Sequence, residues 1–222
     1  MNNNRYTLID YLRTLAIVLM VAYHCLFDLS QLRFIDVSIF NSLPATVVGR
    51  ASLVLFLFCV GYSLALSHSN GIQWQKFFRR LLKISFFAGA VSLGTYISNP
   101  EAWIYFGILH HIAVASVAGL LFLRIPIIAL LLGIACMAAF WGWGWYLPWI
   151  HLPRPSLDYI ALFPWFGCVL VGIGCYRFQP HRYIRPPELK AITWLSEKSL
   201  WIYLIHQPVM MGSLWLLRQA LH

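Results

Sequence analysis

Apolar segments of about 20 residues recur along the whole chain, and this recurrence limits the fold more than any other feature. A helix needs about 20 apolar residues to cross the hydrocarbon of a bilayer. The segments that approach this length are Leu8–Leu29, Thr46–Ser67, Leu81–Ile97, Trp103–Leu123, Pro126–Leu147, Tyr159–Tyr176 and Leu200–Leu217. The pattern predicts an all-α, polytopic transmembrane bundle of about seven spans. It leaves no room for a separate soluble domain, so we expect residues 1–222 to form a single integral membrane domain.

Composition supports this class of protein. The chain is 60% hydrophobic and only 10% charged, whereas soluble domains carry about 25% charged residues. Its mean hydropathy is +0.71. The first apolar segment has Asp10 and Arg13 inside its apolar onset and no small-residue cleavage pattern after it. We therefore interpret it as a retained first span and not as a signal peptide.

The net charge of +9 reflects basic residues that lie between the predicted spans. The segments after the second and sixth spans hold most of them: Lys76, Arg79, Arg80, Arg177, Arg182, Arg185, Lys190 and Lys198. Cytoplasmic loops of membrane proteins are enriched in Lys and Arg. This distribution predicts a cytoplasmic N-terminus and an outer C-terminus. It also indicates membrane lipids as partners and gives no reason to expect nucleic acid.

The first span contains a histidine and an aspartate that could carry chemistry. Ionisable groups inside a span are costly and usually face the interior of a bundle. His24 and Asp28 are four residues apart, so they lie on one helical face. A neutral His24 could act as a general base, with Asp28 fixing its tautomer and stabilising its charged form. The alternative is an i,i+4 pair at a helix end that has no catalytic role.

Three further positions are predicted to lie on the outer side with this pair. Arg50 begins the second span and could pair with Asp28 or bind a substrate phosphate or carboxylate. His110 and His111 are adjacent, hence about 100° apart on a helix, so at most one faces the same cavity.

His206 lies near the middle of the last span. It could bind substrate, or it could only satisfy backbone groups freed by Pro208.

The inner end of the first span carries Arg5, Asp10 and Arg13. Asp10 and Arg13 could form an i,i+3 salt bridge, and basic residues at this level can also bind anionic lipid. Alternatively, the group could receive an acyl donor with several phosphates, such as coenzyme A. His24, Asp28 and one of the adjacent histidines would make three metal ligands, but no close-spaced ligand motif supports a metal site. The five cysteines also lack metal-ligand spacing, so no metal is expected.

Several motifs together resemble one family. The first span has the pattern Arg5-x4-Asp10-x2-Arg13 followed by Tyr23-His24-x3-Asp28. The other matching stretches are Phe56–Leu66 (FLFCVGYSLAL), Tyr105–Ala113 (YFGILHHIA), Phe163–Gly172 (FPWFGCVLVG) and Trp201–Val209 (WIYLIHQPV). The chain resembles the heparan-alpha-glucosaminide N-acetyltransferase-like family, within the transmembrane acyltransferase superfamily.

The resemblance implies transfer of an acetyl or other acyl group from cytoplasmic acetyl-CoA or another acyl-CoA. The acceptor would be an amino or hydroxyl group of a glycan or lipid-linked molecule at the outer face of a bacterial cytoplasmic membrane. His24 matches the histidine that ends the first helix in the superfamily. In the lysosomal enzyme the catalytic histidine lies in the first lumenal loop, whereas residues 30–49 here contain none. The chain is also shorter than that enzyme, so a second copy could complete the acceptor site in a homo-oligomer.

Two other functions remain open at this point. Buried His and Asp side chains also suit a proton-coupled transporter or permease, although the sequence has no internal inverted repeat of the kind many transporters carry. A non-catalytic membrane subunit would tolerate loss of His24. Specific binding of acetyl-CoA would separate an acyltransferase from a transporter.

Overall fold

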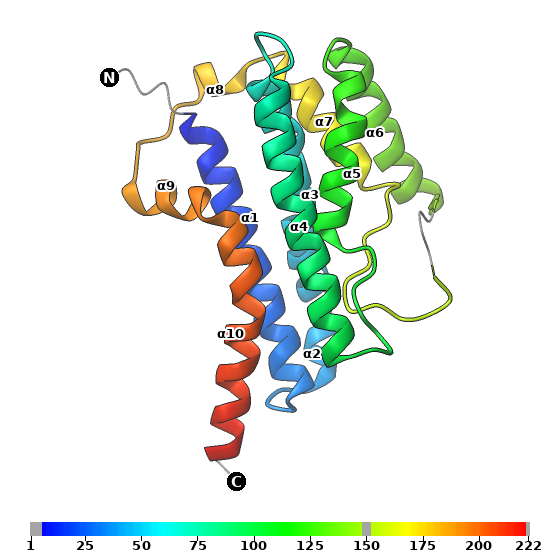
Figure 1. Ribbon diagram of the computed structural model, residues 1–222, viewed down its shortest axis with the longest axis vertical. Coiled ribbons are helices and arrows are strands. Elements are labelled where there is room, and N and C mark those ends of the chain that lie inside the picture. Colours follow the sequence, from blue (N-terminus) through cyan, green and yellow to red (C-terminus); the bar gives the residue numbers. More distant parts are fainter. Residues whose placement is uncertain (1–5, 148–151, 221–222) are drawn as a thin grey trace. The chain divides into compact units, whose positions relative to one another are not determined.

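The computed structural model describes residues 6–147 and 152–220, and every regular element in these residues is a helix (Figure 1). Five helices are long and apolar enough to cross a membrane: α1 (Thr7–Gln31), α3 (Leu43–Ser67), α4 (Trp74–Ser98), α6 (Pro126–Trp143) and α10 (Ser199–Ala220). Two apolar helices are shorter, namely α5 (Ile108–Gly119), continued by the 3-10 turn η1 (Leu120–Phe122), and α7 (Phe166–Tyr176). The remaining helices are α2 (Val37–Phe40), α8 (Pro180–Tyr183) and α9 (Lys190–Glu197). The all-α prediction is confirmed for the described chain.

The two short apolar helices correct the predicted ends of two spans. The segment expected from Trp103 becomes helical only at Ile108, because Gly107 has an extended backbone and the Asp158 carboxylate accepts the Ile108 N–H at 3.2 Å. The segment expected from Tyr159 becomes helical only at Phe166. It contains Pro164, which has no N–H to donate to a helix.

The predicted fifth span is also shorter than expected at its C-terminal end. Helix α6 ends at Trp143, because Gly144 has a φ of 66° in the left-handed region. The N–H groups of Gly144 and Trp145 donate to the carbonyls of Phe140 and Ala139. This is the usual way in which a glycine terminates a helix.

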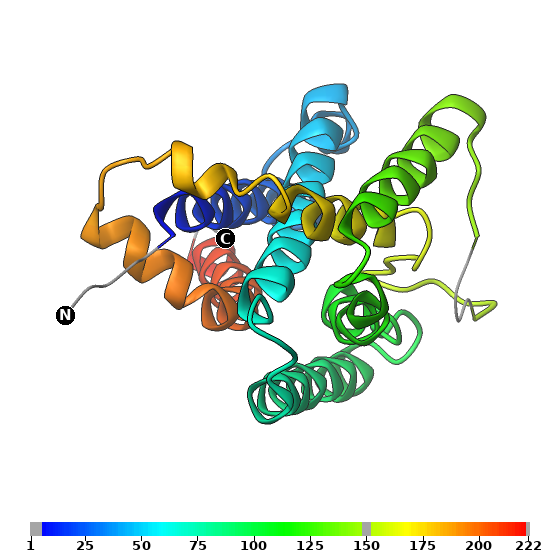
Figure 2. The ribbon, with the colours of Figure 1, turned by 90° about the horizontal axis from the view of Figure 1, so that it is seen from above.

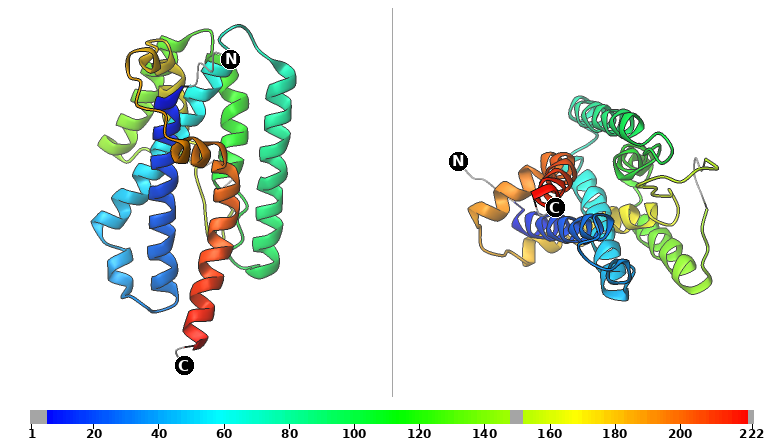
Figure 3. Two further views of the ribbon diagram at one scale, coloured as in Figure 1. Left: turned by 90° about the vertical axis from the view of Figure 1, so that its left-hand side faces the viewer. Right: turned by 90° about the horizontal axis from the view of Figure 1, so that it is seen from below.

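The chain forms two compact units, and the boundary between them falls inside α3. The first unit contains the described residues up to Phe56 together with those from His181 onward. Within it, α10 runs alongside α1 in the same direction, and α9 packs against α1 (Figure 3). The first part of α3 is tied to α1 by Ser52, whose hydroxyl donates to the Ala16 carbonyl at 2.9 Å. This unit therefore brings the last helix of the chain against the first.

The second unit, Leu57–Pro180, is built around α7. Helices α6 and α7 pack closely against each other (Figure 2). On a different face, α7 packs against the second part of α3, where Tyr62 and Val169 are fully buried. Small residues let helix backbones approach closely in membrane proteins, and glycines occupy both of these α7 contacts.

Candidate functional site

In the first unit, His24 presents one ring nitrogen as a hydrogen-bond acceptor. It lies in α1, and its Nδ1 is 2.9 Å from the Met20 carbonyl oxygen one turn earlier. A carbonyl can only accept, so Nδ1 carries the proton. In the neutral ring Nε2 then holds the lone pair. The backbone of α1 itself thus fixes the tautomer that a general base requires.

A second histidine from α10 packs on the first. The rings of His24 and His206 meet edge to face, with centroids 4.9 Å apart and an interplanar angle of 78°. Nδ1 of His206 donates to the Tyr203 carbonyl at 2.7 Å, and Nε2 is buried without a partner in the described chain. His206 therefore has the same tautomer as His24. Its donor goes to the preceding helical turn and not to the Leu204 carbonyl that Pro208 leaves unpaired.

Asp28 is fully buried and takes its partner from α10. Its Oδ1 accepts a hydrogen bond from Nε2 of Gln207 at 2.5 Å. Oδ2 of Asp28 and Oε1 of Gln207 are both buried without a partner among the described residues. The sequence predicted that Asp28 fixes the tautomer of His24, whereas the Met20 carbonyl provides that contact.

We call His24, Asp28, His206 and Gln207 the α1–α10 cluster. Its unsatisfied atoms are all acceptors: the imine nitrogen of His206, one carboxylate oxygen and one amide oxygen. A buried acceptor without a donor is costly. The cluster is therefore chemically suited to a group that brings N–H or O–H donors, and to uptake of a proton. Gln207 was not singled out from the sequence, although it directly follows His206 in the matching stretch Trp201–Val209.

Arg50 belongs to the same unit but does not join this cluster by any hydrogen bond that the structure shows. It lies in the first part of α3 and is exposed. Its predicted role in binding an anionic substrate group remains a prediction.

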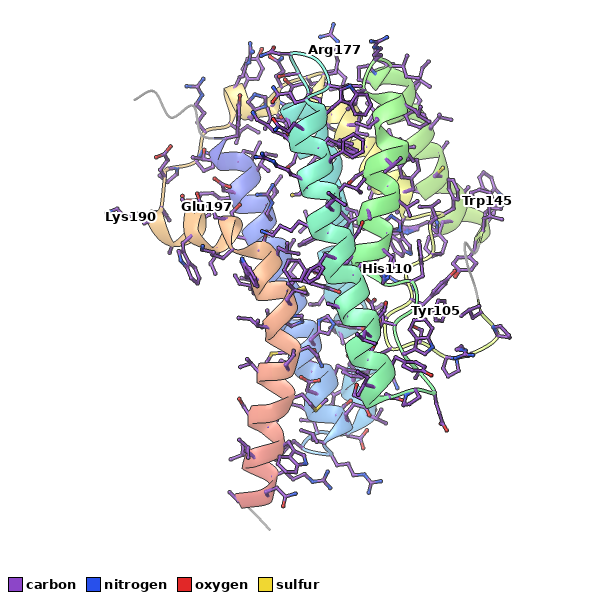
Figure 4. All side chains as sticks on the ribbon, in the orientation of Figure 1. Tyr105, His110, Trp145, Arg177, Lys190 and Glu197 are labelled. Carbon is purple, nitrogen blue, oxygen red and sulfur yellow. The ribbon has the colours of Figure 1, made fainter. Side chains whose placement is uncertain are left out.

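The other end of α1 carries a separate polar group. The Ser196 hydroxyl donates to Oδ1 of Asp10 at 2.6 Å, and the Arg13 guanidinium donates to the Ser196 oxygen at 3.0 Å. Ser196 comes from α9, whose two ends are marked by Lys190 and Glu197 in Figure 4. The predicted donor-binding residues Asp10 and Arg13 are thus bridged by a serine that sequence reasoning missed. Arg5 lies outside the described residues.

Further contacts attach the segment before α10 to the same end of α1. The Thr14 hydroxyl donates to the Ile192 carbonyl at 3.2 Å, and the Tyr11 hydroxyl donates to the Pro187 carbonyl at 3.1 Å. Tyr6 packs edge to face on His181, with ring centroids 4.6 Å apart. Burial lowers the pKa of His181, and the charges of Arg182 and Arg185 lower it further.

His110 and His111 belong to the second unit. His110 lies at the start of α5 (Figure 4), where its Nδ1 accepts the Gly107 N–H at 3.3 Å. Its Nε2 is 3.2 Å from the Ser92 hydroxyl oxygen and donates to it, because that hydroxyl in turn donates to the Ile104 carbonyl at 2.6 Å. His110 therefore caps α5 and anchors it to α4.

His111 faces a different direction from its neighbour. It is fully buried, and its ring lies near the backbone of Ile160 and Ala161 without a well-formed hydrogen bond. The two adjacent rings have different surroundings, as residues about 100° apart on a helix do. The expectation that at most one of them faces the same cavity as His24 stays a prediction. Substrate binding by either histidine stays a prediction.

No group of three His, Cys, Asp or Glu side chains in residues 6–147 and 152–220 has a geometry that could hold a metal ion. All five cysteines are free thiols in the described chain.

Five apolar helices of membrane-spanning length indicate an integral membrane protein, and two of them, α1 and α10, hold a histidine with a free ring nitrogen and a buried carboxylate. The family model described as heparan-alpha-glucosaminide N-acetyltransferase, catalytic, matches residues 5–208. The chain belongs to the heparan-alpha-glucosaminide N-acetyltransferase-like family, and this membership indicates a membrane acetyltransferase. Neither the curated proteins nor the solved structures gave a match.

Proposed function

We propose that the protein moves an acetyl or other acyl group from cytoplasmic acyl-CoA to an amino or hydroxyl group of a glycan or lipid-linked acceptor at the outer face. The observation that carries this proposal is the tautomer of His24, whose Nδ1 is bonded to Met20 and whose Nε2 is left as a base. Family membership supplies the reaction class. General bases are effective when they can reach the proton of the attacking group.

The roles follow from the chemistry of acyl transfer. As the acceptor nitrogen or oxygen attacks the thioester carbonyl, Nε2 of His24 takes its proton. The carbon–sulfur bond then breaks, and the proton passes from His24 to the departing thiolate. Asp28 stabilises the charged imidazole, and His206 binds the acceptor through its own lone pair. The site must hold donor and acceptor together, and this positioning can lower the activation barrier by several kcal/mol.

The proposal includes a seven-span topology with a cytoplasmic N-terminus, in which α5 and α7 also cross the membrane. Arg5, Asp10 and Arg13 would then lie on the side of the acyl donor, and the α1–α10 cluster towards the acceptor side. The basic links support this orientation through the positive-inside rule. We place the protein in a bacterial cytoplasmic membrane on the strength of the family likeness.

A second candidate is a proton-coupled transporter. The observation in its favour is the ring contact between His24 and His206, next to the Asp28–Gln207 pair. Such a row of ionisable groups between spans is typical of proton relays. A transporter would move protons or a solute across liposomes and would not need acyl-CoA.

The experiment that tests the proposal uses the purified full-length protein in detergent with radiolabelled acetyl-CoA. We expect wild type to bind the donor and slowly release acetate. His24→Ala should bind it equally well and turn over about 10²–10⁴-fold more slowly, the usual contribution of a general base. His222→Ala serves as the matched control and should behave as wild type.

Two results would contradict the proposal. If folded wild type does not bind acetyl-CoA, the proposed acyl transfer is wrong. Proton or solute flux in liposomes then becomes the test of the transporter. If His24→Ala turns over at the wild-type rate, the reaction class survives but His24 is not the base.

A further inference from the structure

The second unit contains a pocket that is lined by none of the candidate site residues described above. It lies where the C-terminal end of α3 meets the first turns of α4, and its volume is about 100 Å³. Most of its lining surface is apolar, and its polar side chains include His68, Gln73, Lys76 and Arg80. The two positive charges of Lys76 and Arg80 favour an anionic ligand.

The apolar lining of the pocket comes from two helices. Leu64 comes from α3, whereas Phe77, Leu81 and Ile84 come from α4. Phe77 and Ile84 are buried. A ligand that fills the pocket must therefore combine an anionic group with an apolar portion.

His68 is held in place with one nitrogen available to a ligand. Its Nδ1 donates to the Leu64 carbonyl at 2.8 Å, and its ring packs edge to face on Phe77 with centroids 5.9 Å apart. Nε2 is buried and has no partner in the described chain. In the neutral ring Nε2 then holds a lone pair, which can accept a hydrogen bond from a hydroxyl of the ligand.

Ser116 provides an independent indication that the pocket binds a ligand. It comes from α5, lines the pocket and is only 3% exposed, yet its hydroxyl has no partner among the described residues. An unsatisfied buried hydroxyl costs about 1–3 kcal/mol. An acceptor oxygen in the pocket would satisfy it.

The start of α4 adds further donors. This helix has 25 residues, and its first backbone N–H groups have no carbonyl within the helix to bind. The N-terminal end of a helix favours negative charge and is a common phosphate site. Lys76 and Phe77, in the first turn, place this end of α4 at the pocket.

We propose that this pocket binds the phosphate headgroup of an anionic membrane phospholipid. The chemistry recognised is a phosphate ester that carries an apolar chain. Its membrane source is favoured because the pocket lies at the ends of two candidate spans, and α4 exposes apolar side chains such as Leu82 and Phe86 just beyond it. Basic pockets between transmembrane helices bind anionic headgroups in this way.

The test measures thermal unfolding of the full-length protein in detergent, titrated with phosphatidylglycerol or with phosphatidylcholine. We expect phosphatidylglycerol to raise the Tm of wild type and phosphatidylcholine to have little effect. The double variant Lys76→Gln, Arg80→Gln should bind phosphatidylglycerol about 30-fold more weakly, from the loss of two basic residues. Arg79→Gln is the matched control, because Arg79 is exposed on the same helix and does not line the pocket.

Ser116→Ala keeps the proposal testable if the double variant does not fold. In phosphatidylcholine it should be at least as stable as wild type, because it removes the unsatisfied hydroxyl, but it should respond several-fold more weakly to phosphatidylglycerol. The proposal is wrong if Arg79→Gln weakens the response as much as the double variant does. It is also wrong if inorganic phosphate or coenzyme A stabilises the protein through Lys76 and Arg80 while phosphatidylglycerol does not, since the ligand would then be a soluble phosphate.

Discussion

At the scale of single residues, the proposed function gives Asp28 two separable roles. Its Oδ1 accepts a hydrogen bond from the Gln207 amide, and in the proposed reaction its charge stabilises the protonated form of His24. Asp28→Asn keeps an acceptor oxygen for Gln207 but removes the charge. We expect stability to change by less than about 1 kcal/mol. Acetyl transfer should slow roughly 10- to 100-fold, equivalent to about 1.4–3 kcal/mol of lost charge stabilisation, as measured by turnover beside thermal unfolding.

Gln207→Leu is the complementary variant for this comparison. It leaves the buried Asp28 carboxylate without its partner, so we expect a loss of about 1–3 kcal/mol in the free energy of unfolding. If Asp28→Asn proves as unstable as Gln207→Leu, the charge of Asp28 stabilises the fold. A loss of activity in Asp28→Asn would then follow from lost stability and would not support the proposed catalytic role.

The sequence identified His24, Asp28 and His206 as candidates but not the groups that contact them. Helical spacing alone places His24 and Asp28 on one face of α1, and polarity within a span marks His206. The Met20 carbonyl, Gln207 and Ser196 could not be identified this way. The packing of α1, α9 and α10 determines which acceptor a histidine binds and which helix supplies the partner. Residue spacing contains no information on this packing.

At the scale of elements, α7 is fixed by glycines on more than one face. A Cβ at Gly172 would overlap the Phe58 carbonyl oxygen of α3, and one at Gly174 would lie 2.5 Å from the Cβ of Leu130 in α6. We predict that Gly172→Ala destabilises the protein by about 1–3 kcal/mol, as overpacking of a close helix contact does. Thermal unfolding in detergent is the measurement.

Gly89→Ala is the matched control for that substitution. Gly89 lies inside α4 with open space around its Cβ position. Alanine is the better helix former, so the change should be neutral or stabilising by up to about 1 kcal/mol. Equal losses from both variants would mean that the α3–α7 contact is not as close as described.

Hydropathy located the elements but not all of their ends. It predicted the five long helices, although α4 begins at Trp74, seven residues before the expected start at Leu81, and α6 ends at Trp143, before the expected Leu147. It placed the starts of α5 and α7 too early, since the apolar residues before Ile108 and Phe166 are equally hydrophobic but lie in irregular backbone. The Ser92 and Thr95 hydroxyls bind the Ile104 carbonyl and N–H at 2.6 and 3.0 Å, satisfying backbone groups that a helix would otherwise pair.

At the scale of the whole molecule, the proposed topology depends on the two short helices. If α5 and α7 cross the membrane, the link after α6 lies outside and the link between η1 and α6 lies inside. If neither crosses, these two links exchange sides while the C-terminus remains outside. The position of the C-terminus therefore cannot distinguish seven spans from five, whereas the two links can.

We predict that a cysteine at Arg154 is labelled from outside intact cells by a membrane-impermeant maleimide, and that one at Arg124 is not. Each substitution is made in a chain whose five native cysteines are replaced by alanine. Arg154 is exposed in the link after α6, so water reaches it. Arg124→Cys should react only after the cells are permeabilised, which also shows that the thiol is accessible. The reverse pattern would establish five spans and would place the basic Arg124 link outside, against the positive-inside rule that underlies the proposed orientation.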